Sequence, residues 1–481
     1  MLFNSIGFIS VFLPLAIFCY YLSPKRFRNI TLFVVSVLFY AFLAPQYLWL
    51  LVLVVITTYL GGILISHAKK IEHLVQTVVV VCVLAFLFYF KYFSFFQEVS
   101  NSLFNTDFEV LNLVLPLGIS FYTFQALSYL IDVGRGVCAV QKNFLNLALY
   151  LMLFPPLISG PIVRYSEMEN QITNRETSFE KIKLGITRFV AGLSKKVIIA
   201  DLLGVIADKI FVCQPDSISH FVAWSGAFTY LLQIYYDFSG YSDMAIGLCL
   251  IFGFSIPENF NYPLTATSVS DFWRRWNITL SAWLKDYLFY PIMRSEVVNN
   301  LVLISSKFLN KTITTNSVTP IVALIFTWAL IGLWHGAALT FLIYGIFHGV
   351  LISLEFLFGI NKKSSNKVVN FAKHIYLLFA VTVGIVIFRA ENITYAIGYL
   401  KNMFLAEKIS SNIPLLYYFD TFDVLIIALA ILFAFPVFEK FYNSKTKLSV
   451  RVKTALLALL VIICFAQIAD MSYTTFIYFK F

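Results

Sequence analysis

Two histidines lie between long apolar segments in the second half of the chain. His335 follows Trp334 in the run from Gly332 to Gly336, and His348 lies thirteen residues further on. A histidine in apolar surroundings is usually neutral and can accept a proton from a hydroxyl group, so His335 is a candidate general base. The alternative for His335 is a hydrogen-bonded structural histidine between helices. For His348 we expect a supporting or core position rather than a catalytic one.

A second group of reactive side chains occupies residues 270–277, which read SDFWRRWN. On a helix, Asp271 would contact Arg274 and Arg275, three and four residues later. Arginines of this kind can bind the phosphates of a nucleotide-like donor, and Asn277 could orient a reacting group. The same pattern also fits an interfacial helix with basic anchors and amphipathic tryptophans.

Two carboxylates, Asp237 and Asp243, interrupt a long apolar run that reads YYDFSGYSD between residues 235 and 243. Charged groups inside a membrane segment are costly and usually functional. These two could pair with the arginines of residues 270–277 or line a polar tunnel. Because no histidine or cysteine lies nearby in the sequence, we expect no metal site.

The composition indicates which solvent surrounds the chain that carries these polar side chains. Of 481 residues, 60% are hydrophobic and 12% are charged, and the mean hydropathy is +0.82. Soluble domains are about 45–50% apolar and about 25% charged, so lipid must be the solvent here. We predict an all-α polytopic membrane protein with about eleven or twelve transmembrane helices. The candidate spans lie near residues 6–22, 29–44, 46–66, 74–96, 113–131, 197–213, 221–251, 318–334, 337–358, 372–388, 422–438 and 455–470.

Two further stretches, 145–161 and 257–291, fit no simple span. The first is apolar but broken by prolines, and the second mixes aromatic and charged residues. Irregular backbone at membrane depth needs protein or a water-filled cavity to satisfy its polar groups. We therefore expect re-entrant or interfacial helices around a cavity. No polar block separates domains, so the chain is expected to form one membrane domain over 1–481.

The net charge of +10 comes from basic clusters that flank the apolar segments. Such clusters favour the cytoplasmic side of a membrane, and placing the N-terminus outside puts them all inside. The basic charge thus indicates topology and contact with lipid rather than a nucleic-acid partner. The six cysteines are scattered without a CxxC pair, so neither a disulfide framework nor a cysteine metal site is expected.

Several motifs, taken in order, resemble the membrane-bound O-acyltransferase (MBOAT) family, and most of all its bacterial branch of alginate O-acetyltransferase membrane subunits. The residues that carry the likeness include SGPIVRY, GLSKKVIIAD, YYDFSGYSDMAIGL and GLWHGAALTFLIYGIFHG. The likeness covers roughly residues 1–360. Residues 361–481 match in hydropathy alone.

The resemblance implies a ring of transmembrane helices around a thin centre, with His335 as the catalytic histidine and His348 as a second, supporting one. It also implies a bacterial cytoplasmic membrane protein that takes an acetyl group from a cytoplasmic donor, expected to be acetyl-CoA. The acceptor would be an exported polysaccharide or cell-wall glycan, reached directly or through a periplasmic acyltransferase partner. The cations placed to meet the donor's phosphates are Arg274, Arg275, Lys195 and Lys196.

The chain departs from that branch at two places. Where the branch typically reads WRRWH, this sequence has Asn277, which can hydrogen-bond an acyl carbonyl or a nucleophile but cannot shuttle a proton. A mechanism with two histidines at this site is therefore excluded. A glycine-rich turn of the family is also missing after Pro291. Two rival hypotheses are a transporter or flippase for a lipid-linked glycan, and a catalytically silent scaffold.

Overall fold

The computed structural model describes residues 2–111, 113–300, 315–362, 364–405, 417–437, 450–470 and 477. Within these ranges the chain is helical, and its extended pairing is limited to an isolated antiparallel bridge between Phe260 and Trp276. The chain divides into two compact units. Unit 1 comprises Met1–Val197, Ser239–Glu258 and Thr454–Ser472, and unit 2 comprises Ile198–Phe238, Asn259–Lys453 and Tyr473–Phe481. The single membrane domain expected over 1–481 stays a prediction.

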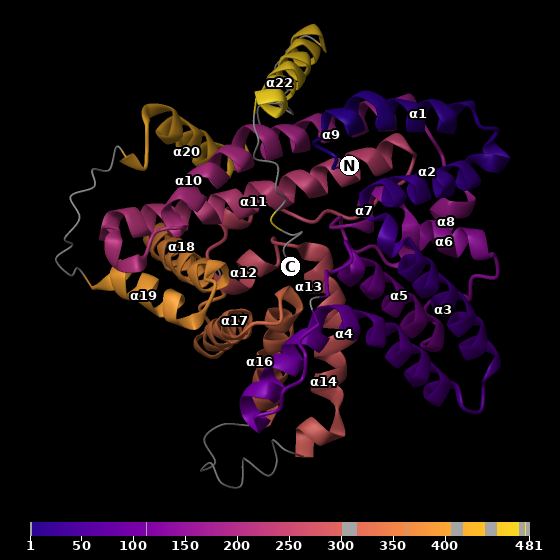
Figure 1. The fold of residues 1–481 in the computed structure, drawn as a ribbon, viewed down its shortest axis with the longest axis horizontal. Coiled ribbons are helices and arrows are strands. Elements are labelled where there is room, and N and C mark those ends of the chain that lie inside the picture. The colour runs from indigo at the N-terminus through magenta and orange to yellow at the C-terminus, as the bar shows by residue number, and fades with distance from the viewer. Residues whose placement is uncertain are drawn as a thin grey trace. The chain divides into compact units, whose positions relative to one another are not determined.

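Unit 1 is built mainly from the N-terminal helices (Figure 1). Its helices are η1 (Phe8–Phe12), α1 (Leu13–Leu22), η2 (Lys25–Phe27), α2 (Arg28–Leu43), η3 (Pro45–Tyr47), α3 (Leu48–His67), α4 (Glu72–Phe104), α5 (Ile119–Gly134), α6 (Phe144–Met152), α7 (Phe154–Leu157), α8 (Tyr165–Thr173) and α9 (Phe179–Ser194). It also contains the second part of α11 (His220–Ile251) and most of α22 (Val450–Asp470).

Unit 2 contains the two histidines and the SDFWRRWN segment. Its helices are α10 (Asp201–Phe211), η5 (Pro215–Ser217), the first part of α11, η6 (Pro263–Thr265), α12 (Val269–Trp273), α13 (Ile278–Leu284), η7 (Lys285–Phe289), α14 (Tyr290–Arg294), α16 (Thr315–His335), α17 (Leu339–Phe358), α18 (Lys367–Arg389), α19 (Ile393–Phe404) and α20 (Thr421–Phe433). The π-helical segment η4 (Lys195–Ala200) joins α9 to α10.

Seven helical segments in the described part of the chain are long and apolar enough to cross a membrane. They are Lys25–Leu43, Pro45–His67, Glu72–Phe104, Val318–His335, Leu339–Phe358, Lys367–Arg389 and Arg451–Asp470, and the shorter apolar helices are Phe8–Leu22 and Thr421–Phe433. Together these correspond to nine of the predicted spans. The chain is thus an all-α multi-pass membrane protein, as the composition predicts.

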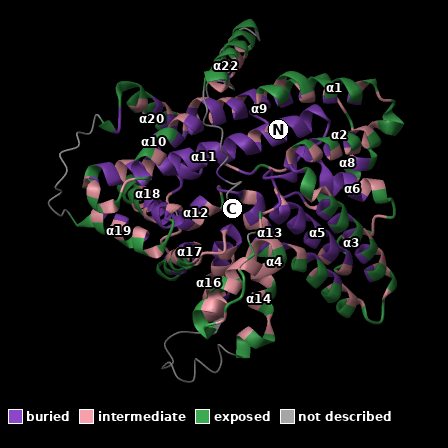
Figure 2. Cartoon of the chain, viewed as in Figure 1, coloured by how far each residue is buried: buried purple, intermediate pink, exposed green. Residues whose placement is uncertain are grey.

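Three predicted spans look different in the structure. The range 113–131 becomes helical only at Ile119, and 197–213 divides into a π-helical segment and the eleven-residue α10. The helix α11 is long enough to span, but it is buried by protein along most of its length, whereas α22 is mostly exposed (Figure 2). Membrane crossing by these three segments stays a prediction.

The two stretches expected to be irregular do break into short helices. Residues 145–161 fall largely on α6 and α7, which are separated at Leu153, and residues 257–291 include α12, α13, η7 and the start of α14. Prolines and a change of backbone direction divide these segments because Pro lacks the N–H that a continuous helix needs. The second of these stretches forms one side of the candidate site.

Candidate active site

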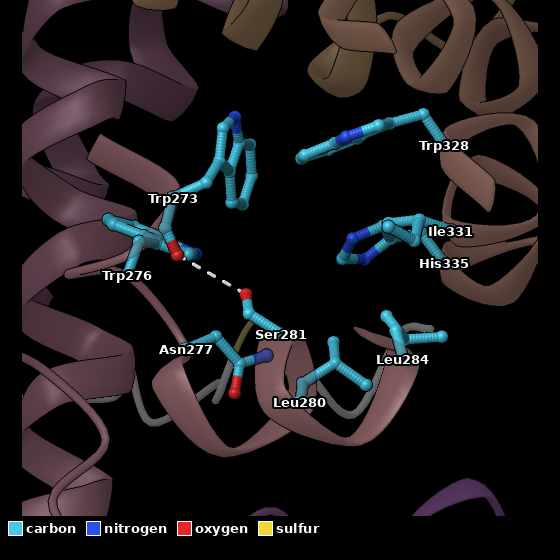
Figure 3. A pocket seen from close by; sticks show the side chains of 9 residues that line it. All are labelled: Trp273, Trp276, Asn277, Leu280, Ser281, Leu284, Trp328, Ile331 and His335. Atoms are coloured by element: carbon cyan, nitrogen blue, oxygen red, sulfur yellow. Dashed lines mark hydrogen bonds between the residues drawn. The ribbon is translucent and has the colours of Figure 1, made fainter. Parts of the chain in front are cut away.

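A small pocket in unit 2 brings together the two motifs that the sequence marks as reactive. It is lined by Trp273, Trp276, Asn277, Leu280, Ser281, Leu284, Trp328, Ile331 and His335. The side chains of the α12–α13 segment lie on one side, and those of α16 lie on the other (Figure 3). The pocket has room for about one water molecule. The pocket is narrow and mostly apolar.

His335 is the last residue of α16, and only 5% of its surface is exposed. Its ring meets those of Tyr344 and Phe388 edge to face, with centroids 6.0 and 5.1 Å away. Trp334 packs beside it at 4.8 Å. His335 is thus enclosed by aromatic rings at the end of α16, and its role as a general base stays a prediction.

A close contact between α16 and α17 fixes where His335 lies relative to the pocket. A Cβ added to Gly345 would lie 2.2 Å from the carbonyl oxygen of Trp328, and one added to Gly332 would lie 2.2 Å from that of Phe341. Real Cβ atoms do not approach backbone so closely, so only glycine lets these two helices pack backbone to backbone. The glycines around the Trp-His-Gly motif therefore have a packing role.

Asn277 faces the same pocket from a left-handed backbone conformation, with φ 44° and ψ 56°. Asn is among the few residues other than Gly that adopt this conformation readily. The side-chain oxygen Oδ1 of Asn277 is buried and has no hydrogen-bond partner among the described residues. A buried acceptor without a partner costs about 1–3 kcal/mol, which a bound ligand can offset.

Backbone and side-chain hydrogen bonds clamp the segment on both sides of Asn277. The N–H of Asn261 donates to the Arg275 carbonyl at 2.9 Å, and that of Ile278 donates to the Asn259 carbonyl at 3.0 Å. Oδ1 of Asn259 accepts the N–H and the hydroxyl of Thr279 at 3.2 and 2.8 Å. These bonds hold the turn in its strained conformation.

His348 lies behind the pocket wall rather than in the lining. Its Nδ1 accepts the indole N–H of Trp273 at 3.4 Å, and the residue is fully buried. A Cβ on Gly384 would lie 2.7 Å from Nε2 of His348, so α18 also packs closely here. Of the two alternatives, the structure places His348 as a core residue that supports Trp273.

The arginines expected at the donor side form the ion pairs that helical spacing predicts. Nε of Arg275 lies 3.0 Å from Asp271, and Nη2 of Arg274 lies 3.5 Å from it. The side chain of Arg274 remains 67% exposed, so it is accessible to a phosphate. Binding of a donor by these two arginines stays a prediction.

The other two predicted donor cations belong to unit 1. Nζ of Lys195 lies 2.6 Å from Oδ2 of Asp243, and Lys196 is 3% exposed. Because Lys195 is already neutralised and Lys196 is buried, neither offers a simple surface charge. Their role in donor binding also stays a prediction.

Among the described residues, the two carboxylates of α11 are found beside different groups. Asp243 pairs with Arg188 at 2.8 Å as well as with Lys195, and Arg188 also binds Glu258. Asp237 accepts the backbone N–H of Ile477 at 2.8 Å. Of the options for Asp243, a pairing with cations is found, but these cations are not the arginines of residues 270–277. Within the described ranges no three His, Cys, Asp or Glu side chains gather as they would around a metal ion.

Sequence reasoning missed several residues of this region. Trp328 and Ile331 line the pocket, but an apolar residue on an apolar helix carries no signal that separates it from the core. Glu355 is different, because an acid within the apolar span Leu339–Phe358 is rare and could have been noticed. It contacts the α12 segment directly.

Comparison with known proteins shows the family to which the chain is similar. The model of the membrane-bound O-acyltransferase family matches residues 139–303. The chain is 38% identical to the probable alginate O-acetylase of Pseudomonas aeruginosa, over 84% of this chain and 75% of that protein. It is 31% identical to the peptidoglycan O-acetyltransferase of Helicobacter pylori, over 100% of this chain and 98% of that protein.

A more distant relative is the teichoic acid D-alanyltransferase of Bacillus subtilis, at 28% identity over 50% of this chain and 59% of that protein. The relatives that align over most of both chains are named as acetylases or acetyltransferases. Together with the multi-pass helical fold, these similarities identify the chain. It belongs to the membrane-bound O-acyltransferase family and is an O-acyltransferase.

Proposed function

We propose that this enzyme moves an acetyl group from acetyl-CoA on the cytoplasmic side of a bacterial inner membrane to a hydroxyl group of an exported glycan. The observation that carries the proposal is that His335 and Asn277 face each other across one pocket, with Oδ1 of Asn277 buried without a partner. A proton acceptor opposite an amide is what acyl transfer to a hydroxyl needs.

In the proposed reaction the hydroxyl oxygen of the acceptor attacks the carbonyl carbon of the thioester. His335 takes the hydroxyl proton while the new C–O bond forms. The C–S bond then breaks, and the proton passes to the departing thiolate to give free CoA. The products are one acetyl ester and one thiol, so atoms and charge balance.

The amide of Asn277 can form hydrogen bonds with both reactants of this step. Its N–H₂ group can donate to the thioester oxygen as negative charge develops there, and its Oδ1 can accept from the attacking hydroxyl. An amide does not titrate, so all proton transfer falls to His335. The pocket has room for about one water molecule, so its apolar walls must move to admit any acyl group, and they must move further for a chain longer than acetyl.

The acceptor class is inferred from the relatives, whose names refer to alginate, peptidoglycan and teichoic acid. We infer an exported polysaccharide or a cell-wall glycan, acylated directly or through a periplasmic acyltransferase partner. The exposed Arg274 and its neighbour Arg275 are the cations of unit 2 proposed to meet the phosphates of the donor. Lys195 and Lys196 are proposed to contribute after Lys195 exchanges its carboxylate partner.

The test uses purified protein in detergent with radiolabelled acetyl-CoA. Wild type should consume acetyl-CoA by transfer or hydrolysis, and His335→Ala should lower kcat by about 10²–10⁴-fold, the range of general base catalysis. Retained turnover in His335→Ala would show that this histidine is not the base. Absence of both binding and turnover in wild type would indicate a donor other than CoA.

The matched control is His67→Ala. His67 ends α3 and bonds the Ile63 carbonyl of its own helix at 2.8 Å, far along the chain from the pocket residues. This variant should keep wild-type turnover. If both histidine variants lost activity equally, the loss would reflect handling of the protein rather than the chemistry of His335.

A further inference from the structure

Glu355 is a fully buried carboxylate within the apolar helix α17. It lies in the last turn of that helix, where the partial negative charge of the helix end disfavours another negative charge. A carboxylate inside a membrane span is costly unless donors surround it. Something in the fold must therefore compensate this residue, and its contacts identify what that is.

The compensation comes from the first turn of α12, the short helix that leads into the pocket. Glu355 accepts the backbone N–H of Val269 at 2.6 Å and that of Ser270 at 2.8 Å. It also accepts the hydroxyl of Ser270 at 2.6 Å. Tyr376 of α18 also lies beside the same carboxylate. Hydrogen bonds to an ionised acceptor are about twice as strong as neutral ones.

These contacts account for the N–H groups that the start of a helix leaves without intrahelical partners. The next amide, that of Asp271, donates to the hydroxyl of Ser268 at 3.0 Å. The first turn of α12 is thus satisfied partly by its own cap and partly by a side chain from α17. Without Glu355, two buried N–H groups would have to find other acceptors.

The same helix supports the other end of α12 as well. His348 lies two turns before Glu355 on α17, and it accepts the indole N–H of Trp273, the last residue of α12. Because α17 also packs against α16 at Gly332 and Gly345, one helix contacts both sides of the pocket. Trp276 and Asn277 follow α12 directly, so their position depends on where α12 is held.

We propose that Glu355 is a positioning residue that anchors α12 to α17 and thereby sets the placement of Asn277 opposite His335. The expected effect on kcat rests on the proposed function. The attachment of α12 to α17 can be measured without turnover. A misplacement of about 1 Å in a reacting group can cost about 10²-fold in rate. The anchor should therefore act on kcat rather than on the affinity for the donor.

The decisive variant is Glu355→Gln, which keeps the size of the side chain but replaces one acceptor oxygen with a donor. In full-length protein in detergent, kcat should fall about 10- to 100-fold while KM for acetyl-CoA stays within about twofold. Hydrogen exchange measured by mass spectrometry on a peptide over residues 266–276 should become about tenfold faster. Glu355→Asp, which keeps the charge on a shorter side chain, should recover part of both losses.

Ser353→Ala is the matched control. Ser353 lies on the same helix, is buried, and donates only to the Gly349 carbonyl of its own helix at 2.7 Å. This variant should leave kcat and exchange of residues 266–276 unchanged. If Glu355→Gln does not fold, Ser270→Ala decides the matter, because it removes the hydroxyl donor alone and should speed exchange and lower kcat by a few-fold.

Two results would overturn the proposal. Unchanged exchange of residues 266–276 in a folded Glu355→Gln protein would show that no anchor exists. Faster exchange with wild-type kcat would show that the anchor does not position the chemistry. If wild type itself does not turn over acetyl-CoA, the proposed function fails, and the exchange measurement alone still decides whether Glu355 holds α12.

Discussion

The contact between α9 and α11 in unit 1 and the pocket between α13 and α16 in unit 2 both place polar side chains among apolar ones. In unit 1, Asp243 binds Arg188 and Lys195, and Arg188 also binds Glu258. Every charge in this group has an opposite charge beside it. In unit 2, by contrast, Oδ1 of Asn277 has no hydrogen-bond partner in the described part of the chain.

This difference is the basis for our prediction that Asn277, and not Asp243, contacts the reacting groups. A buried charge that is paired within the protein stabilises one conformation and has little capacity left for a ligand. A buried acceptor that faces a cavity carries a cost in the free protein, which only a bound molecule relieves. The sequence shows polar residues in both regions, but their partners show which region is suited to chemistry.

After His335→Ala, the largest effect should come from Asn277. Replacing Asn277 by Ala removes the amide and should lower kcat about 10²-fold, the loss typical of one donor to a developing oxyanion. Asn277→Gly should lose as much activity while relieving the left-handed strain, so its melting temperature should equal or exceed that of Asn277→Ala. Equal activity of wild type and Asn277→Gly would mean that the backbone turn, and not the amide, is what the site requires.

Two glycine-to-alanine variants then distinguish an effect on helix packing from an effect on catalysis. A Cβ on Gly345 would lie 2.2 Å from the carbonyl oxygen of Trp328, and one on Gly192 would lie 2.5 Å from that of Gly240. Ala at either position should destabilise the protein by about 2–3 kcal/mol, because the helices must move apart. Only Gly345→Ala should also lower kcat of the folded fraction. Equal kcat in both variants would show that α16 is not the element that places His335.

The two ion pairs of Arg188 in unit 1 should matter for stability alone. Arg188→Met removes the cation between Asp243 and Glu258, and should lower stability by about 1–2 kcal/mol, less than for a fully buried pair because Arg188 is 25% exposed. Thermal unfolding followed by size-exclusion chromatography measures this loss. Turnover per folded molecule should stay at the wild-type value, and a loss of turnover would contradict a purely structural role.

The smallest effect is expected at Arg274, the exposed arginine that follows α12. Arg274→Ala should raise KM for acetyl-CoA about five- to tenfold and leave kcat unchanged, since a phosphate contact contributes to binding rather than to the chemical step. The difference from wild type should shrink at high salt. An unchanged KM at low salt would indicate that the donor's phosphates bind elsewhere.

Hydropathy alone was enough to predict the membrane class and nine of the helical segments. A run of about 20 apolar residues is most stable as a helix that crosses a membrane. The pattern also singled out His335 and Asn277, since polar residues between apolar runs are costly and therefore informative. Pairing of Asp271 with Arg274 and Arg275 was predictable as well, because spacing along one helix determines it.

Other features required the tertiary structure, because they depend on residues far apart in the chain. The partners of Asp243 lie 48 and 55 residues away in sequence, and the N–H groups bound by Glu355 lie 86 and 85 residues before it. The left-handed turn at Asn277 is likewise held by Asn259 and Asn261. The sequence by itself determined that the protein is helical and lies in a membrane, because local hydropathy suffices for these, whereas the catalytic role of His335 stays a prediction. Only the tertiary structure decided which polar side chains are neutralised and which face the pocket, because long-range packing chooses their partners.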